Sequence, residues 1–346
     1  PQTCAGADRK AGRRRGGMSL PQTTLVDGHG RSVTYLRLSI TDRCDFRCVY
    51  CMSEDMTFLP RNQVMDVDEL VVIAAAFVRQ GVTRIRLTGG EPLLHPDLLT
   101  LVSRIKALPG LQELALTTNG ARLAALAAPL KQAGLDRINI SLDSLNPERF
   151  RRLTRTGRLD KVLAGIDAAR AAGFARIKLN TVMLRGRNDD EIVDLVRFAR
   201  HRELDLAFIE EMPLGDIVEH DRALSFMPSN AVLSRIEEQF PLQRSAEETG
   251  GPARYYRMAD SPIRIGVISP HSNNFCGSCN RVRVTASGRL LLCLGNDNAV
   301  ELRPLAGQPA RLEQAIRGAI THKPERHHFN LEEPSGIVRF MNMTGG

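Results

Sequence analysis

Short apolar runs of strand length alternate with stretches of helical periodicity between residue 33 and about residue 210. Polar or glycine-rich residues follow each run, and an amphipathic stretch comes next. The predicted strands lie at 35–40, 82–87, 111–116, 137–142, 175–184 and 204–210. The predicted helices lie at 70–81, 98–108, 121–133, 159–172 and 189–201. About six such units predict an α/β fold with a parallel sheet and outer helices, most simply an incomplete, open β/α barrel.

The regular alternation ends at about residue 214. A further strand is predicted at 263–268, and a hairpin at 281–285 and 289–292 turns at Ser287 and Gly288. We therefore expect a barrel over 19–213 and a C-terminal region over 214–346 that covers the barrel mouth. Residues 1–18 are rich in Arg, Gly and Ala and lack the apolar centre of a secretory signal, so we expect a disordered basic leader there.

The composition is that of an ordinary globular protein, with 42% hydrophobic and 25% charged residues. No apolar run is long enough to span a membrane, and we expect a cytoplasmic protein without membrane contact. The formal net charge of +8 favours an anionic partner. The charge alone leaves open whether that partner is a phosphorylated small molecule or a nucleic acid.

Cys44, Cys48 and Cys51 form a CxxxCxxC run directly after the first predicted strand. Three thiolates with no fourth beside them can hold three irons of a 4Fe–4S cluster and leave the fourth iron open for a ligand. A structural zinc site would prefer four ligands. Three unligated, buried cysteines are the remaining alternative, but the charged residues within the run argue against it.

A second group of three cysteines, Cys276, Cys279 and Cys293, again has no obvious fourth ligand. His271 is close in sequence, but a single nearby His is more often structural. Arg281 and Arg283 alternate on a predicted strand and therefore project to one face, where guanidinium groups can bind phosphate or carboxylate oxygens. A solvated strand face is the alternative.

Gly89, Gly90, Glu91 and Pro92 follow the second predicted strand. Glycines allow a ligand to approach the backbone, and a carboxylate can accept bonds from a ligand ammonium, although a GGEP segment alone could be a simple turn. Together with CxxxCxxC, the segment resembles the radical S-adenosylmethionine (SAM) enzymes. The resemblance implies that SAM chelates the open iron, and that one electron from the cluster produces a 5′-deoxyadenosyl radical.

From about Thr34 to the last residue, the chain more specifically resembles the GTP 3′,8-cyclase (MoaA-type) family of molybdenum cofactor biosynthesis. The resemblance is carried by YLRLSITDRC, by CxxC-x-R-x-R with a third Cys thirteen residues further on, and by the terminal Gly345–Gly346. It implies a lyase that cyclises GTP to (8S)-3′,8-cyclo-7,8-dihydroguanosine 5′-triphosphate, the first step of molybdopterin formation. The Gly-Gly tail is expected to reach into the active site.

The resemblance also implies a role for each matching residue. The first 4Fe–4S cluster would be held by Cys44, Cys48 and Cys51, and the second, which contacts the guanine, by Cys276, Cys279 and Cys293. The SAM pocket would contain Tyr50, Gly90, Glu91, Ser141 and Met212. The GTP pocket would contain Arg37, Arg86, Thr117, Lys178, Arg281 and Arg283. Arg281 and Arg283 are also the catalytic candidates, since they would hold the triphosphate and stabilise the rearrangement.

The expected partners are GTP, an electron donor such as flavodoxin or ferredoxin, and a downstream cyclic pyranopterin monophosphate synthase that uses the product. A homodimer is also expected, and no nucleic acid. One departure is Ala207, where relatives often have Arg; the roles of Glu210 and Glu211 stay open. The alternatives are another two-cluster radical SAM enzyme of the peptide maturase type, or a basic zinc or nucleic-acid-binding protein.

Overall fold

The computed structural model describes residues 24–215, 217, 220–247, 250–327, 329, 337 and 339–345. The basic leader predicted at 1–18 and the terminal Gly346 lie outside these residues. Within the described part of the chain, no helix is both long and apolar enough to cross a membrane.

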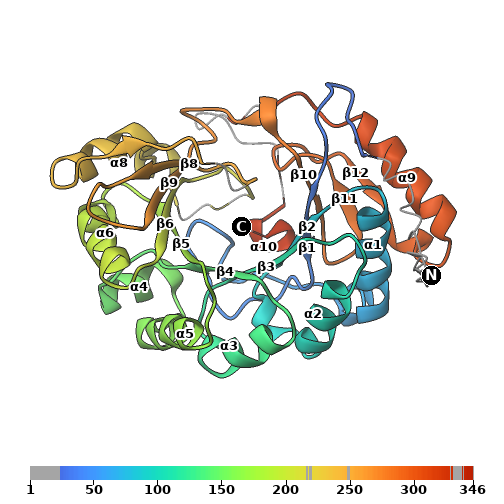
Figure 1. Cartoon of the computed structure of the whole chain (residues 1–346), viewed down its shortest axis with the longest axis horizontal. Coiled ribbons are helices and arrows are strands. Elements are labelled where there is room, and N and C mark those ends of the chain that lie inside the picture. Colours follow the sequence, from blue (N-terminus) through green and yellow to red (C-terminus); the bar gives the residue numbers. More distant parts are fainter. Residues whose placement is uncertain are drawn as a thin grey trace, which may run out of the picture.

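A parallel sheet forms the centre of the fold, and helices cover its outer face (Figure 1). Its strands are β1 (Tyr35–Ser39), β2 (Arg84–Thr88), β3 (Glu113–Thr118), β4 (Arg137–Ser141), β5 (Ile177–Met183) and β6 (Asp205–Glu210). The helices between them are α1 (Val67–Arg79), α2 (Leu98–Lys106), α3 (Leu123–Gln132), α4 (Pro147–Thr154), α5 (Leu159–Ala171) and α6 (Ile192–His201). The six strands pair in chain order and the sheet does not close, so the predicted open β/α barrel is confirmed.

The C-terminal region lengthens this sheet at both edges. Its strands are β7 (Gln243–Arg244), β8 (Arg254–Arg257), β9 (Arg264–Ile268), β10 (Arg281–Val284), β11 (Arg289–Leu291) and β12 (Ala299–Glu301). β9 pairs in parallel with β6, and β10 pairs in parallel with β1, which gives the order β12-β11-β10-β1-β2-β3-β4-β5-β6-β9-β8-β7. The sequence pattern predicted the β10–β11 hairpin but did not predict that this region would join both edges of the barrel.

The remaining helices are α7 (Arg222–Ser225), α8 (Ser229–Glu237), α9 (Pro309–Thr321) and α10 (Met341–Thr344). α9 lies beside α1 on the outside, whereas α10 lies within the curve of the sheet, close to β1 (Figure 1). The last described residues of the chain are therefore inside the barrel, beside the strands that carry the predicted site.

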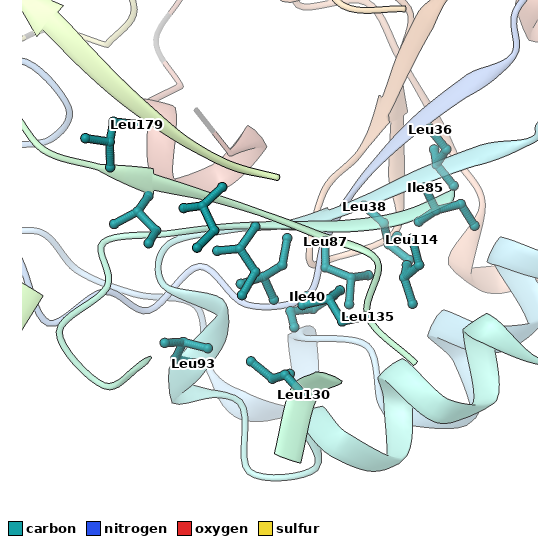
Figure 2. Packing of buried hydrophobic residues seen from close by; sticks show 14 of the residues in the cluster. Leu36, Leu38, Ile40, Ile85, Leu87, Leu93, Leu114, Leu130, Leu135 and Leu179 are labelled. Atoms are coloured by element: carbon teal, nitrogen blue, oxygen red, sulfur yellow. The ribbon is translucent and has the colours of Figure 1, made fainter. Parts of the chain in front are cut away.

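The two faces of the central strands differ in polarity. Leu36 and Leu38 of β1 pack with Ile85 and Leu87 of β2 on the face that the helices cover (Figure 2), and all four side chains are fully buried. Burial of one such side chain stabilises the fold by about 1.5–3 kcal/mol. Because successive strand residues point to opposite faces, the intervening residues turn polar groups toward the barrel interior. On β1 and β2 these include Arg37 and Arg86.

Candidate active site

Two adjoining cavities lie at the mouth of the barrel, and each contains one of the cysteine triads. We call the cavity with Cys44, Cys48 and Cys51 the first pocket and the cavity with Cys276, Cys279 and Cys293 the second pocket. Asn180, Ile209 and Met212 line both cavities and therefore form their common boundary. The two triads therefore lie near each other at the barrel mouth, as the sequence pattern predicted.

The cysteine loop of the first pocket follows β1 and is fixed by short backbone contacts. The N–H of Val49 donates to the Leu153 carbonyl at 3.0 Å, and the Arg47 guanidinium donates to the Cys44 carbonyl at 2.7 Å. Burial raises the pKa of all three thiols, that of Cys51 to about 12, and the Asp143 carboxylate raises the pKa of Cys48 and Cys51 further. Thiolates in this environment require a compensating cation, which bound iron would supply.

The donor set fits a cluster better than a single ion. Among the described residues, no group of three or more His, Cys, Asp or Glu side chains is placed to hold one metal ion. Cysteine thiolates are the ligands that iron–sulfur clusters use, and each triad lines a cavity with room for a bound group.

The GGEP loop packs directly on the start of the cysteine loop. The N–H groups of Gly90 and Glu91 donate to the carbonyls of Thr41 and Arg43 at 2.8 and 2.7 Å. A Cβ atom added at Gly90 would collide with the Arg43 carbonyl. The glycine therefore serves a backbone-to-backbone approach as well as the approach of a ligand that the sequence suggested.

Two buried carboxylates cross-link the loops around the first pocket. Glu91 accepts hydrogen bonds from the Leu93 N–H, the Thr118 hydroxyl and the Asn119 N–H at 2.6–2.9 Å. Burial raises the pKa of Glu91 to about 7. Asp143 accepts from the Tyr50 hydroxyl at 2.6 Å and from the Val182 N–H at 2.9 Å, and burial raises its pKa to about 6.

Every residue predicted for the SAM pocket lines the first pocket. These residues are Tyr50, Gly90, Glu91, Ser141 and Met212. The predicted GTP residues divide differently. Arg37, Arg86, Lys178, Arg281 and Arg283 line the second pocket, whereas Thr117 lines the first and accepts a hydrogen bond from the Arg86 guanidinium at 3.3 Å.

The second pocket concentrates positive charge. Within the described residues, Arg86, Lys178 and Arg283 form no ion pair with a carboxylate. Burial and the neighbouring Arg86 and Arg137 lower the pKa of Lys178 to about 7. Burial and Arg281 likewise lower the pKa of Arg283 to about 9. Buried cations that depress one another in this way favour a polyanionic ligand, which would restore their full charge.

The second triad is held in place by Arg31, a residue that the sequence did not single out. Its guanidinium donates to the Cys276 carbonyl at 2.7 Å and to the carbonyls of Pro324 and Glu325, each at 2.7 Å. Asp27 pairs with it at 2.6 Å. Arg31 thus joins the N-terminal turn, the cysteine loop and the segment after α9 into one wall of the second pocket.

That segment brings two further residues to the sulfurs. The Lys323 ammonium donates to the Cys279 sulfur at 3.5 Å, and Nδ1 of His327 lies 3.0 Å from the Cys276 sulfur. His271, the weak ligand candidate, instead lies 2.9 Å from the Glu211 carbonyl through Nε2 and does not line this pocket.

The described end of the chain reaches both pockets. The Gly345 carbonyl accepts bonds from Arg283 at 2.8 Å and from Arg37 at 3.3 Å, while Asn342 lines the first pocket and donates to the Asp42 carbonyl at 2.9 Å. The expectation that the tail reaches into the site is met for Gly345, and Gly346 lies outside the described residues.

The roles of Glu210 and Glu211 become clear from their partners. Glu210 accepts bonds from the N–H groups of Ser229, His271 and Ser272 at 2.8–3.1 Å, which ties β6 to the loop after β9. Glu211 binds His220 Nε2 at 2.8 Å and Arg222 at 3.2 Å. Both carboxylates therefore fix the segment that carries Met212 at the pocket boundary.

Ala207 is fully buried on β6 and pairs with Gly266 of β9. The ring of Tyr255 lies over Gly266, where an added Cβ would be 3.1 Å from its Cε1 atom and 3.4 Å from the Ala207 Cβ. Ala207 lines neither pocket. The ring of Tyr255 therefore packs close to Ala207, and position 207 contributes no charged side chain to either pocket.

The open barrel, the cysteine loop after β1 and the GGEP loop after β2 define a radical SAM protein. A family model for the Radical SAM superfamily matches residues 38–199, and one for Molybdenum Cofactor Synthesis C matches residues 204–329. The cofactors of the superfamily are SAM and an iron–sulfur cluster, and the first pocket fits both.

The chain belongs to the family of GTP 3′,8-cyclases. It is 62% identical to the GTP 3′,8-cyclase of Pseudomonas entomophila (strain L48), an alignment that covers 93% of this chain and 98% of the relative. It is 58% identical to that of Pseudomonas fluorescens (strain Pf0-1), with 94% and 100% covered. The family resemblance inferred from the sequence is thereby confirmed.

Among solved structures, Streptococcus suis SuiB bound to S-adenosylmethionine has a similar fold. Its TM-score is 0.57 at 16% identity, covering 84% of this chain and 67% of that chain. A second crystal structure of Streptococcus suis SuiB gives a TM-score of 0.58 at 15% identity, with 84% of this chain and 69% of that chain covered. At this identity the similarity concerns the fold alone.

Proposed function

We propose that this chain cyclises GTP to (8S)-3′,8-cyclo-7,8-dihydroguanosine 5′-triphosphate, the first step of molybdenum cofactor biosynthesis. The proposal rests on one observation. Two differently charged pockets, each with a cysteine triad, adjoin one another and share the lining residues Asn180, Ile209 and Met212. A reaction between a radical formed in one cavity and a nucleotide held in the other requires this adjacency. Membership of the GTP 3′,8-cyclase family supports the same conclusion.

In the first pocket, Cys44, Cys48 and Cys51 would hold a 4Fe–4S cluster and leave one iron for the amine and carboxylate of SAM. When bound, these cofactors supply the 5′-deoxyadenosyl radical that removes hydrogen from the ribose 3′ carbon. The chain's own residues orient the cofactor. The Asp143 carboxylate holds the Tyr50 ring through its hydroxyl, and the Glu91 carboxylate fixes the loops after β2 and β3.

In the second pocket, Cys276, Cys279 and Cys293 would hold a second 4Fe–4S cluster, which would provide a binding site for the guanine. Arg281 and Arg283 on β10, with Arg37, Arg86 and Lys178 from the neighbouring strands, would bind the triphosphate. Arg283 and Arg37 both donate hydrogen bonds to the Gly345 carbonyl. Triphosphate oxygens would therefore compete with the tail for these two guanidinium groups, and the tail would respond to substrate.

The remaining parts of the proposal concern organisation and partners. The barrel over 19–213 would provide the radical chemistry, and the region over 214–346 the nucleotide contacts. The reducing electron would come from a flavodoxin or ferredoxin, and a cyclic pyranopterin monophosphate synthase would use the product. The enzyme would be homodimeric and cytoplasmic.

Anaerobic incubation of the reconstituted protein with reductant, SAM and each nucleoside triphosphate in turn tests the substrate. We expect 5′-deoxyadenosine and a cyclised nucleotide with GTP only. Equal 5′-deoxyadenosine formation with all nucleotides would contradict the proposal. Colourless protein that binds zinc and no iron or sulfide would instead identify the zinc-protein alternative.

Single arginine variants test the catalytic assignment. Arg283→Met should abolish cyclisation with normal iron content, because it removes a guanidinium from the second pocket. Arg289→Met is the matched control, since Arg289 lies on the neighbouring strand β11 in a solvent-exposed pair with Glu301. Full turnover by both the Arg281→Met and Arg283→Met variants would exclude the roles proposed for these residues.

A further inference from the structure

Lys323 is a buried cation beside the second cysteine triad. It lies two residues after the end of α9, its N–H donates to the Ile320 carbonyl at 3.0 Å, and only 3% of the residue is exposed. The ammonium donates to the Cys279 sulfur at 3.5 Å. The contact joins residues 44 positions apart in the sequence. Arg31, through the carbonyls of Cys276 and Pro324, holds the two segments together.

The ammonium has no carboxylate partner among the described residues. A lysine is almost never fully buried unless an opposite charge accompanies it, because desolvation of the ion costs several kcal/mol. The surrounding cations, Arg281 and Arg283, increase this cost. Among the described residues, the Cys279 sulfur is the group to which the Lys323 ammonium donates a hydrogen bond, and a negatively charged ligand on that sulfur would compensate the buried cation.

The first triad has the opposite surroundings. The carboxylates of Glu91 and Asp143 line the first pocket together with its three cysteines. The second triad instead shares its pocket with the cations of Arg281, Arg283 and Lys323. Two clusters of the same ligand type would thus lie in fields of opposite sign. The reduction potential of an iron–sulfur cluster depends on local charge and on hydrogen bonds to its sulfurs.

We propose that Lys323 is a positioning residue of the second cluster, where its ammonium bonds the Cys279 sulfur and makes this cluster easier to reduce. The inference depends on the proposed function, because it requires that Cys276, Cys279 and Cys293 bind a cluster. Lys323 acts through Cys279 and contacts the sulfur, so it differs from the arginines assigned to the triphosphate. This assignment excludes two other roles for Lys323: a purely structural role, and a role in binding only the substrate phosphate.

The experiment isolates the second cluster in the full-length chain. In a Cys44→Ser, Cys48→Ser, Cys51→Ser background, anaerobic reconstitution leaves only the second triad to bind iron. The midpoint potential of that cluster is then measured by redox titration with electron paramagnetic resonance. Lys323→Met should lower the reduction equilibrium constant at least tenfold, which is about 59 mV for one electron. Lys323→Arg keeps the charge and should restore most of the potential.

Lys178→Met is the matched control, because it removes a cation from the same pocket that makes no contact with a sulfur. Its shift should be much smaller than that of Lys323→Met. A Lys323→Met protein with an unchanged potential but weaker binding of inorganic tripolyphosphate would overturn the inference and make Lys323 a phosphate-binding residue. An unchanged potential with unchanged tripolyphosphate binding would also overturn it and leave a structural lysine.

The iron and sulfide content of the reconstituted protein distinguishes a failure of this inference from a failure of the proposed function. A background protein with intact Lys323 that binds no iron or sulfide would refute the second cluster itself, and the role of Lys323 with it. If Lys323→Met loses its iron, Lys323→Gln, which keeps a hydrogen-bond donor without the charge, replaces it in the titration. A Lys323→Gln potential equal to that of the lysine protein would refute the effect of charge.

Discussion

The close approach of the GGEP loop to the cysteine loop makes Gly90→Ala a severe test of how the first pocket is built. The methyl group would meet backbone atoms of Arg43 and Asp42, which cannot rotate away as a side-chain end could. The loops must separate, and the bonds from Gly90 and Glu91 to the carbonyls of Thr41 and Arg43 would lengthen or break.

The magnitude follows from these two effects. Overpacking of a tight site costs about 1–3 kcal/mol. Each lost backbone hydrogen bond adds about 1 kcal/mol. We therefore expect Gly90→Ala to lower the free energy of unfolding by about 2–5 kcal/mol, the sum of these costs. The loss should also displace the cysteine loop, so that iron at the first triad falls while iron at the second triad is retained.

Chemical denaturation of the apo protein under anaerobic conditions measures the first effect, since a changed midpoint at constant slope reports stability. Gly318→Ala is the control, because Gly318 lies in α9, is exposed and has no atom near the position of an added Cβ. It should be neutral or stabilise by up to about 1 kcal/mol. A Gly90→Ala protein with the midpoint and iron content of the parent would refute the close-approach argument.

Three further predictions concern the charges in the two pockets and the residue that holds the second cysteine triad in place. GTP affinity of SAM-free protein should fall as pH rises above about 7, because Lys178 has a lowered pKa of about 7 and the triphosphate prefers its charged form. Calorimetry from pH 7 to 8, below the pKa of about 9 of Arg283, should show this slope for the parent and a much shallower one for Lys178→Met. The stability of Asp143→Asn relative to the parent should increase as pH rises toward about 6. Because the pKa of Asp143 is raised in the folded protein, its carboxyl group stabilises the fold fully below the ordinary pKa of 3.8, and this stabilisation is lost as pH rises through about 6. Equal differences in unfolding free energy between variant and parent at pH 5 and pH 8 would contradict the assignment. Arg31→Met should cost about 3–5 kcal/mol, the effect of breaking a buried ion pair, and should release iron from the second triad first. Its control is Arg158→Met, from an exposed pair with Asp160 that should contribute almost nothing; indistinguishable denaturation curves for the two variants would rule out the structural role of Arg31.

The barrel could be predicted because its signals are local. Leu36 and Leu38 alternate with polar residues, and the start of α1 is marked by a capping box between the N-cap Asp66 and Glu69 in its first turn. The cysteines were found because their spacing is itself the signal. Gly90 was found for the same reason, although the sequence could not show that its missing side chain makes room for the Arg43 carbonyl.

The second pocket was only partly predictable, because its walls come from distant segments. The sequence located Arg281 and Arg283 on one strand face, but the parallel pairing of β10 with β1 depends on contacts between segments more than two hundred residues apart. Arg31, Lys323 and His327 carry no motif and no periodicity. A buried lysine becomes conspicuous only when its surroundings are known, so the structure was needed to find Lys323.

The groups that line the two pockets differ in charge, and this difference would separate the ligands of the two cysteine triads. Both triads offer the same ligands, so the difference between them must come from their neighbours. The carboxylates of Glu91 and Asp143 suit a ligand with positive charge, and SAM carries a sulfonium and an ammonium. The cations around Arg283 suit a triphosphate. Each ligand would be repelled from the pocket of the other, so electrostatics would direct SAM and GTP to opposite sides of Asn180 before any specific contact is made.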